Sequence, residues 1–356
     1  MNRATAGLLV VLPVLLSACD ITSKSASPTQ NATATSSAPG LAFTCRLPVV
    51  QPLPTGSALF QTAFVDFPGG AVTIDPKGAF EQHNELYTSV ALPHLAGLSW
   101  PAWDQPFSRW VPAEREAISQ DGAHYAYTIA GSDYPKSNHH PLLHLVDIGT
   151  GADRIITLPA LDPFLTWGVA SFTTEGIYLR KLPYEGISPP GLWLLNPTTG
   201  SVQLAASDSA LSSPRAGTVW VNSLDPADAG ALRDAYSGTI LPDEVIQQDL
   251  KSGARVVWFY RPGKSVHLLG LDQSGHPFVL VATGQSSADR VELWLVPAPG
   301  SGQPLWSGSE ASNLSALVGD AHAVWFSGPG GIFIYTPAGG FQKVPAVTGQ
   351  IAGQCS

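Results

Sequence analysis

Short runs in which hydrophobic and polar residues alternate recur along the chain, and turn-forming residues separate them. The clearest example is residues 191–206, GLWLLNPTTGSVQLAA, where two such runs flank Asn196, Pro197 and Gly200. Alternation bounded by Asn, Pro and Gly is typical of two antiparallel strands with a tight turn between them. This stretch therefore predicts a β-hairpin.

Comparable hairpins are expected at six places along the chain. Their turns lie at residues 66–70, 147–151, 196–200, 249–253, 297–302 and 336–340. The turn glycines from the second hairpin onward are Gly151, Gly200, Gly253, Gly302 and Gly340, which are 38 to 53 residues apart. Repeats of this length with about four strands each are typical of a β-propeller. We predict an all-β propeller of six blades, or seven if residues 77–108 form an irregular blade, with the ring closed near the two chain ends.

Two motifs in the second repeat resemble those of bacterial WD40-like and TolB-like propeller repeats. Ser119-Gln120-Asp121-Gly122 resembles their SPDG inner turn, with Gln120 in place of proline, and residues 146–151, VDIGTG, resemble the strand end that follows. The last repeat, residues 324–340, is similar to a streptogramin-lyase repeat, which would imply a catalytic histidine and a magnesium site. His322 precedes that strand, but no second matching His-Glu pair follows. These resemblances indicate a fold and leave the function open.

The first 19 residues are expected to be an export signal, with Arg3 before an apolar stretch at residues 7–16. That stretch is too short to span a hydrocarbon core of about 30 Å. Leu16-Ser17-Ala18-Cys19 resembles the bacterial lipoprotein cleavage box, which implies lipidation of Cys19; an ordinary cleaved signal is the alternative. Residues 20–41, rich in Ser, Thr, Ala and Pro, are expected to be a flexible tether, and residues 42–356 the propeller. Such a protein would be anchored in the cell envelope, on the outer face of the cytoplasmic membrane or on the periplasmic side.

Two cysteines remain once Cys19 is lipidated, and they lie at opposite ends of the propeller domain. A propeller has to bring its ends together to close the ring, and export supplies an oxidising compartment. We therefore predict a disulfide between Cys45 and Cys355, with a free thiol pair or a metal site as the alternatives.

The ten tryptophans fall into two groups. Trp193 and Trp294 occupy the same place in their repeats and are predicted to be core residues between blades. Trp100 and Trp103 lie outside the regular repeat, as does Tyr134. We name these three residues as candidate contacts for a sugar ring or a peptide at a propeller mouth; the alternative is that they cover the apolar edge of the first blade.

Histidines cluster at residues 139–144, where His139, His140 and His144 lie near Asp133. Such residues are suitable metal ligands, but no HExxH or CxxC motif accompanies them, so a polar surface loop is the expectation. No cofactor, metal site or catalytic residue is predicted.

The composition narrows the function classes. A formal net charge of −9 disfavours nucleic acid, whose phosphates require a basic surface. We expect a binding or protein-interaction module whose partner is an envelope protein, a peptide or a glycan. Two alternatives stay open: a lyase or glycan-acting hydrolase with a polar site at the channel mouth, and a structural envelope protein.

Overall fold

The computed structural model describes residues 41–52, 60–78, 101–129, 140–161, 167–181, 191–207, 214–225, 241–282, 291–309, 314, 316–328, 330–344 and 347–356. Its regular structure is almost entirely β-strand, and the two described helices are single 3-10 turns, η1 (Pro76–Gly78) and η2 (Arg115–Ala117). In the described part of the chain no helix has the length and apolar composition needed to cross a membrane. The predicted all-β class is confirmed.

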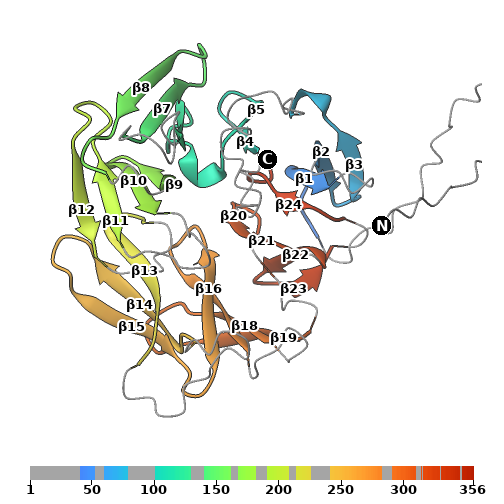
Figure 1. Ribbon diagram of the computed structural model, residues 1–356. Helices are drawn as coiled ribbons and strands as arrows, with labels where there is room; N and C mark the ends of the chain where they lie inside the picture. The colour runs from blue at the N-terminus through green and yellow to red at the C-terminus, as the bar shows by residue number, and fades with distance from the viewer. Residues whose placement is uncertain are drawn as a thin grey trace, which may run out of the picture. The chain divides into compact units, whose positions relative to one another are not determined.

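Six antiparallel sheets of three or four strands form the six blades of a propeller (Figure 1). From the axis outward, blade 1 contains β24 (Gln350–Ile351), β1 (Cys45–Pro52), β2 (Phe60–Phe67) and β3 (Ala71–Ile74). In the same order, blade 2 contains β6 (His124–Ile129), β7 (Leu142–Asp147) and β8 (Asp153–Thr157). Blade 3 contains β9 (Trp167–Thr173), β10 (Gly176–Lys181), β11 (Leu192–Leu195) and β12 (Val202–Ala206).

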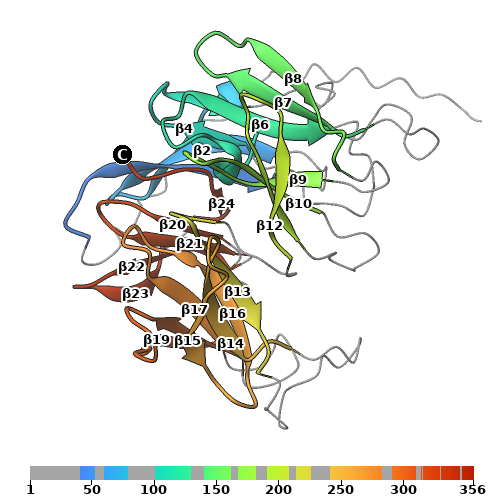
Figure 2. The same cartoon turned by 90° about the vertical axis from the view of Figure 1, so that its left-hand side faces the viewer.

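The remaining three blades follow the same order along the chain. Blade 4 contains β13 (Thr218–Ser223), β14 (Glu244–Asp249) and β15 (Arg255–Tyr260). Blade 5 contains β16 (Ser265–Leu271), β17 (Pro277–Ala282), β18 (Val291–Leu295) and β19 (Gln303–Gly308). Blade 6 contains β20 (Ala316–Gly319), β21 (Val324–Gly328), β22 (Gly331–Thr336) and β23 (Gly340–Lys343). Figure 2 shows β13 and β14 beside β16, where blades 4 and 5 meet.

The hydrophobic core is divided among the junctions between successive blades. Separate clusters of buried side chains join blades 2 and 3, 3 and 4, 4 and 5, 5 and 6, and 6 and 1. Both faces of each sheet carry apolar residues. Each face therefore needs a neighbouring sheet to cover it, and the core is divided among the junctions. The repeat in the sequence therefore dictates a ring.

A two-stranded ribbon, β4 (Ala102–Asp104) and β5 (Arg109–Val111), fills the junction between blades 1 and 2. On one side Trp103 and Trp110 pack against Phe64 of blade 1, and on the other Val111 packs against Ile148 of blade 2. The ribbon begins within residues 77–108, for which the alternative was a seventh, irregular blade. It is too small to be a blade, and the propeller has six.

All six predicted hairpins are present and join the two outermost strands of each blade. Each of their turns has a glycine with φ between +68° and +74°, a conformation that side chains other than glycine rarely adopt. In the fifth hairpin this glycine is Gly300, whereas the repeat in the sequence indicated Gly302. Position 302 needs a glycine for a different reason: a Cβ there would lie 2.6 Å from the ring of Phe259, which is too close.

The repeated tryptophans Trp193 and Trp294 pack at blade junctions, as expected, but each is only half-buried. Trp193 meets Trp167 edge to face at 4.7 Å, and the guanidinium of Arg261 lies 4.4 Å above Trp294. Trp220 and Trp325, which are almost completely buried, are the larger contributors to the core.

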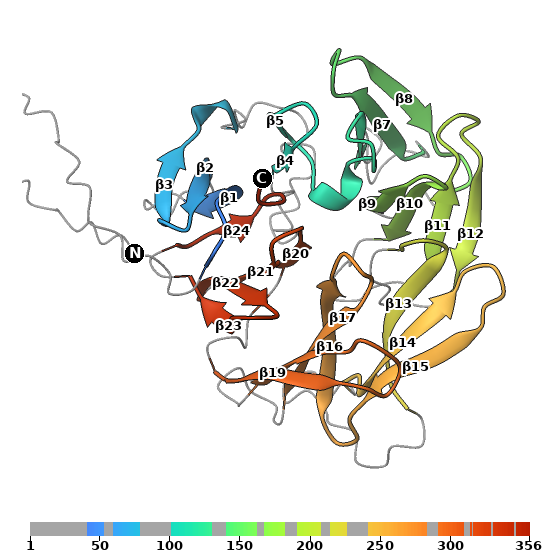
Figure 3. The ribbon, with the colours of Figure 1, turned by 180° about the vertical axis from the view of Figure 1, so that it is seen from behind.

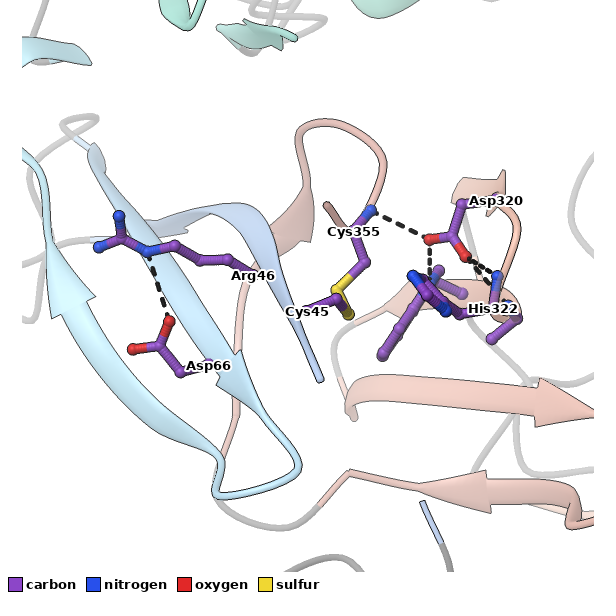
Figure 4. Close-up of a disulfide and its surroundings, with 8 residues drawn as sticks. Cys45, Arg46, Asp66, Asp320, His322 and Cys355 are labelled. Atoms are coloured by element: carbon purple, nitrogen blue, oxygen red, sulfur yellow. Dashed lines mark hydrogen bonds and ion pairs between the residues drawn. A yellow bond between two sulfur atoms is a disulfide. The ribbon is translucent and has the colours of Figure 1, made fainter. Parts of the chain in front are cut away.

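The ring closes where the ends of the described chain pair in blade 1. The C-terminal strand β24 forms the inner edge of this blade, with Val49 opposite Ile351 (Figure 3). Close by, Cys45 and Cys355 form a disulfide with 5.5 Å between their Cα atoms and 310 residues between them in sequence (Figure 4). This geometry supports the predicted clasp.

Asp320 holds the C-terminal segment to blade 6 through a second set of contacts (Figure 4). One carboxylate oxygen accepts hydrogen bonds from the backbone N–H groups of His322 and Ala323. The other accepts from the backbone N–H of Cys355 at 3.0 Å and from the indole N–H of Trp325 at 2.6 Å. Asp320 thus links the inner turn of blade 6, a core tryptophan and the disulfide.

Candidate functional site

The inner strands of the blades approach one another around the axis of the ring. β16 contacts β20, β20 contacts β24, and β9 contacts η2. In blade 2 the segment before the SPDG-like turn forms η2, and only Ile118 bridges to the next strand, at Tyr125. Blade 2 therefore has a 3-10 turn and a single bridge at the place where the other blades have their innermost strand.

Three consecutive charged residues, Glu114, Arg115 and Glu116, occupy this position. The Arg115 guanidinium lies 2.7 Å from a carboxylate oxygen of Glu116. The same Nη2 nitrogen donates to the backbone carbonyl of Leu317 in β20 at 3.0 Å. Arg115 thus connects blade 2 to blade 6, two blades away around the ring.

The two glutamates of this segment titrate in opposite directions. Burial raises the pKa of Glu114, the nearby charge of Glu116 raises it further, and the charge of Arg180 only partly offsets both effects. Burial also acts to raise the pKa of Glu116, but the charge and hydrogen bond of Arg115 outweigh it and hold that pKa below its ordinary value. The side chains of Arg115 and Glu116 are still 37% and 36% exposed, so water reaches them although protein surrounds them.

Arg180 reaches this cluster from the second strand of blade 3. Its partner on the inner strand β9 is Gly168. The positive charge of Arg180 acts to lower the pKa of both Glu114 and Glu116.

A polar pair from blades 4 and 5 also lies on inner strands. Asn222 accepts a hydrogen bond from the backbone N–H of Leu268 at 2.9 Å, and its amide nitrogen is 3.4 Å from Nδ1 of His267. The imidazole of His267 is exposed, yet the surrounding protein lowers its pKa because it disfavours the charged form. We call Glu114, Arg115, Glu116, Arg180, Asn222 and His267 the axial set.

The axial set can both donate and accept hydrogen bonds. Glu116 is held as a carboxylate, Arg180 supplies N–H donors, and His267 is favoured in its neutral form. The Arg115 guanidinium already forms an ion pair with Glu116 and a hydrogen bond to the Leu317 carbonyl. Among the described residues, the side chains of Glu114 and Arg180 have neither a hydrogen bond nor an ion pair, so these two are available to a ligand.

Replacing Glu114 by glutamine is expected to reduce the loss of stability as the pH rises. Because its folded pKa is raised, the folded chain keeps this proton at pH values where the unfolded chain, with the ordinary value of 4.5, has lost it. Stability is therefore lost as the pH rises above 4.5 through the folded pKa. Denaturant unfolding between about pH 4 and about pH 7 should show a shallower decline for Glu114→Gln than for the unmodified chain. Equal declines would contradict the buried position of this carboxyl.

The predicted ligand contacts are only partly described. Trp100 and Tyr134 lie outside the described residues, as does the lipidation site Cys19. Trp103 is half-buried in the ribbon, where it packs edge to face on Phe64 at 4.8 Å and donates its indole N–H to Gln105. These contacts fit the covering role that we gave as the alternative, and a ligand contact at Trp103 stays a prediction.

The histidine cluster is only partly described by the structure. His139 and Asp133 lie outside the described residues. His144 is buried on β7, where its Nδ1 is 2.7 Å from a carboxylate oxygen of Asp153 and its ring stacks on Tyr127. Within the described ranges, no group of three or more His, Cys, Asp or Glu side chains is placed to hold a metal ion.

The axial set was not among the residues expected from the sequence. A usable signal was present at residues 113–117, AEREA, where three charges precede the SPDG-like turn in a chain with only 13% charged residues. A repeat of this kind has an inner strand at that place, so a charged run there marks a departure from the repeat. The remaining members come from three other blades and share no local pattern.

Comparisons with known proteins give likenesses in fold. No protein-family model and no curated protein matches the chain. Among solved structures, TolB from Acinetobacter baumannii matches with a TM-score of 0.43 and 17% identity over 87% of this chain and 67% of its own. An oligogalacturonate lyase in complex with manganese matches with a TM-score of 0.42 and 12% identity over 85% of this chain and 78% of its own.

A third solved structure is an auxiliary nutrient binding protein from Bacteroides thetaiotaomicron. It matches with a TM-score of 0.37 and 11% identity over 72% of this chain and 63% of its own. At such identities and TM-scores these likenesses assign neither a ligand nor an activity. The propeller assignment rests on the six blades themselves.

Proposed function

We propose that this chain is an exported lipoprotein, anchored through Cys19 in the cell envelope, whose propeller is a binding or interaction module. The observation that carries the proposal is the axial set. Its charged side chains do not belong to the hydrophobic clusters that join the blades, and Glu114 and Arg180 have no described side-chain partner. A carboxyl that is half-buried without a partner, as in Glu114, costs stability, and a binding role gives a reason for its presence.

The anchor is tested by replacing Cys19 with serine. We expect the full-length chain to fractionate with membranes and the Cys19→Ser chain to appear in the soluble envelope fraction, because a serine cannot be acylated at this position. Cell fractionation with immunodetection measures the difference. A Cys19→Ser chain that stays with the membrane would show that another element attaches it.

The interaction role is tested by affinity capture from envelope extract with the tagged, detergent-solubilised full chain. The captured species should be reduced when Glu114 is changed to glutamine or Arg180 to alanine. An Asp66→Asn chain is the matched control, because the Asp66 side chain is half exposed and pairs with exposed Arg46 on blade 1. Capture that does not differ among these chains would argue against a role for the axial set.

One observation favours a second candidate function, a glycan-acting hydrolase or lyase. Glu114 and Glu116 have pKa values displaced in opposite directions, which is the pattern of a general acid next to a carboxylate. An enzyme would convert its polysaccharide substrate into product, whereas a binding module would leave it intact. Incubating the full chain with envelope polysaccharides and measuring new reducing ends or unsaturated products should give a signal that Glu114→Gln abolishes, if the chain is such an enzyme.

A further inference from the structure

We propose that β3 (Ala71–Ile74), the outermost strand of blade 1, pairs with the β3 strand of a second copy of this chain and joins two propellers into a symmetric dimer. This surface is separate from the axial set, so the dimer does not depend on the proposed binding function. Three properties of β3 support it: the backbone groups at its outer edge, the side chains that it exposes, and a sequence pattern that is complementary to itself.

The outer edge of β3 carries backbone groups that no described strand pairs with. The strand pairs with β2 on one side and is the last strand of its sheet on the other (Figure 3). The backbone N–H of Asp75 donates to the Thr62 carbonyl at 2.9 Å, so residues 75 and 62 form a hydrogen-bonded pair. Because hydrogen-bonded and non-hydrogen-bonded pairs alternate along antiparallel strands, the N–H and C=O groups of Val72 and Ile74 point away from β2. A strand added at this edge would bond to these two residues.

The side chains of the same two residues are exposed. Val72 is 41% and Ile74 is 53% exposed, and both lie on one face of the blade, since side chains alternate along a strand. On that face the register places them beside Val65 and Ala63, which are fully buried in the cluster that joins blades 6 and 1. The apolar surface of this junction thus continues to the rim of the ring and is exposed there.

The other five outermost strands carry features that hinder edge pairing. β12, β15 and β19 each have an extra residue that shifts the register, and β19 also contains Pro304. β8 begins with the charged residues Asp153 and Arg154, and β23 ends with Lys343. β3 has no charge, no proline and no register shift, and its valine, threonine and isoleucine favour strands. Blade 1 therefore has the edge most suited to pairing among the described strands.

The pattern of β3 is complementary to itself, which identifies a second copy as the partner. An antiparallel pair centred on Thr73 places Val72 of each copy opposite Ile74 of the other. This register pairs every outward N–H of the two residues with an outward C=O. It also sets each exposed valine against an exposed isoleucine and the two threonines against each other, which are cross-strand pairs that stabilise sheets. Two-fold symmetry follows, because the same residues make the contact on both sides.

The first test traps the dimer through position 73. In this register Thr73 faces Thr73 of the second copy in a non-hydrogen-bonded pair, whose Cα atoms lie about 4.5 Å apart, a distance that a disulfide can span. Under mild oxidation the full-length Thr73→Cys chain should form covalent dimers in non-reducing electrophoresis. Gln203→Cys, at an exposed position on the outermost strand of blade 3, should stay monomeric, as should the unmodified chain. Equal cross-linking of the two variants, or none in Thr73→Cys, would overturn the proposal.

The second test measures the association itself. Sedimentation equilibrium of the detergent-solubilised full chain should show reversible dimers at up to about 100 µM, because the interface is small and such interfaces are weak. Val72→Lys should weaken the dimer by about tenfold or more, since a charge on an edge strand opposes pairing. Leu204→Lys is the matched control, because it replaces an aliphatic side chain that is 56% exposed on the outermost strand of blade 3 and changes the net charge equally. It should leave the equilibrium unchanged.

Salt separates strand pairing from an ionic contact. Two copies with a formal charge of −9 repel each other, so screening by salt should strengthen the dimer. Three results would refute pairing through β3: a monomer at about 100 µM, a dimer that dissociates as salt is raised, and equal weakening by Val72→Lys and Leu204→Lys. If Val72→Lys does not fold, Ile74→Lys replaces it with the same expected result.

Discussion

Replacing Cys45 and Cys355 by serine is expected to lower the free energy of unfolding by up to about 5 kcal/mol. The disulfide closes a loop of 310 residues, and loop-closure entropy in the unfolded chain grows with loop length. The figure is an upper value, since residual structure in the unfolded chain reduces it. Denaturant unfolding of the double variant and the unmodified chain measures the difference, with the single Cys19→Ser chain as a control for loss of a cysteine outside the ring.

Without the disulfide, the part of the propeller that we expect to open first is the place where the ring closes. The edge pairing of β24 with β1 involves only Val49 with Ile351 and Val50 with Gln350, so it has few hydrogen bonds of its own. The ribbon depends on the same segment, because the backbone N–H of Trp103 donates to the Ala352 carbonyl at 2.9 Å. Hydrogen exchange in the double variant should therefore be faster at Ile351 and Trp103 than at the centre of β17. Uniform exchange across the propeller would contradict this order of opening.

Replacing Trp325 by alanine is expected to cost about 3–5 kcal/mol of stability. Trp325 is fully buried at the junction of blades 6 and 1, packs 4.7 Å from the ring of Phe67, and donates its indole N–H to Asp320. The substitution opens a cavity at the closing junction and removes one of the hydrogen bonds to the Asp320 carboxylate. Thermal and denaturant unfolding measure the effect.

Two further variants separate packing from hydrogen bonding at this position. Trp325→Phe keeps much of the ring volume but loses the indole N–H and part of the buried ring, so it should cost less than Trp325→Ala. Trp193→Ala, at a half-buried position in another junction, should also cost less. A Trp193→Ala chain that is destabilised as much as Trp325→Ala would show that burial does not set the cost here.

The outer hairpins were predictable because their information is local. Asp147, Asn196 and Asp249 each begin a turn in which the side-chain oxygen accepts backbone N–H bonds two or three residues later. Residues of this kind, followed by a glycine with positive φ, specify the turn without help from the rest of the chain. The same local signal indicated Gly302 wrongly, because its requirement is a close approach to Phe259 that only packing creates.

The axial set was not predictable from the sequence. Arg115 finds its second partner in Leu317, which is 202 residues away, and Asn222 meets His267 across 45 residues. Arg180 of blade 3 acts by its charge on two glutamates that precede blade 2's inner turn. None of these pairings has a periodic signature, and no single blade contains the set.

The sequence by itself determined the repeating blades, the positions of their outer turns and the two cysteines available to close the ring, because alternation and turn chemistry act between residues near one another in the chain. The tertiary structure alone decided that residues 102–111 form a ribbon rather than a blade. It also decided that Asp320 holds the C-terminal segment to blade 6 and that Arg115 bonds to the Leu317 carbonyl. These features depend on distances between segments far apart in sequence, which are set only when the blades pack around a common axis and each face is covered by its neighbour.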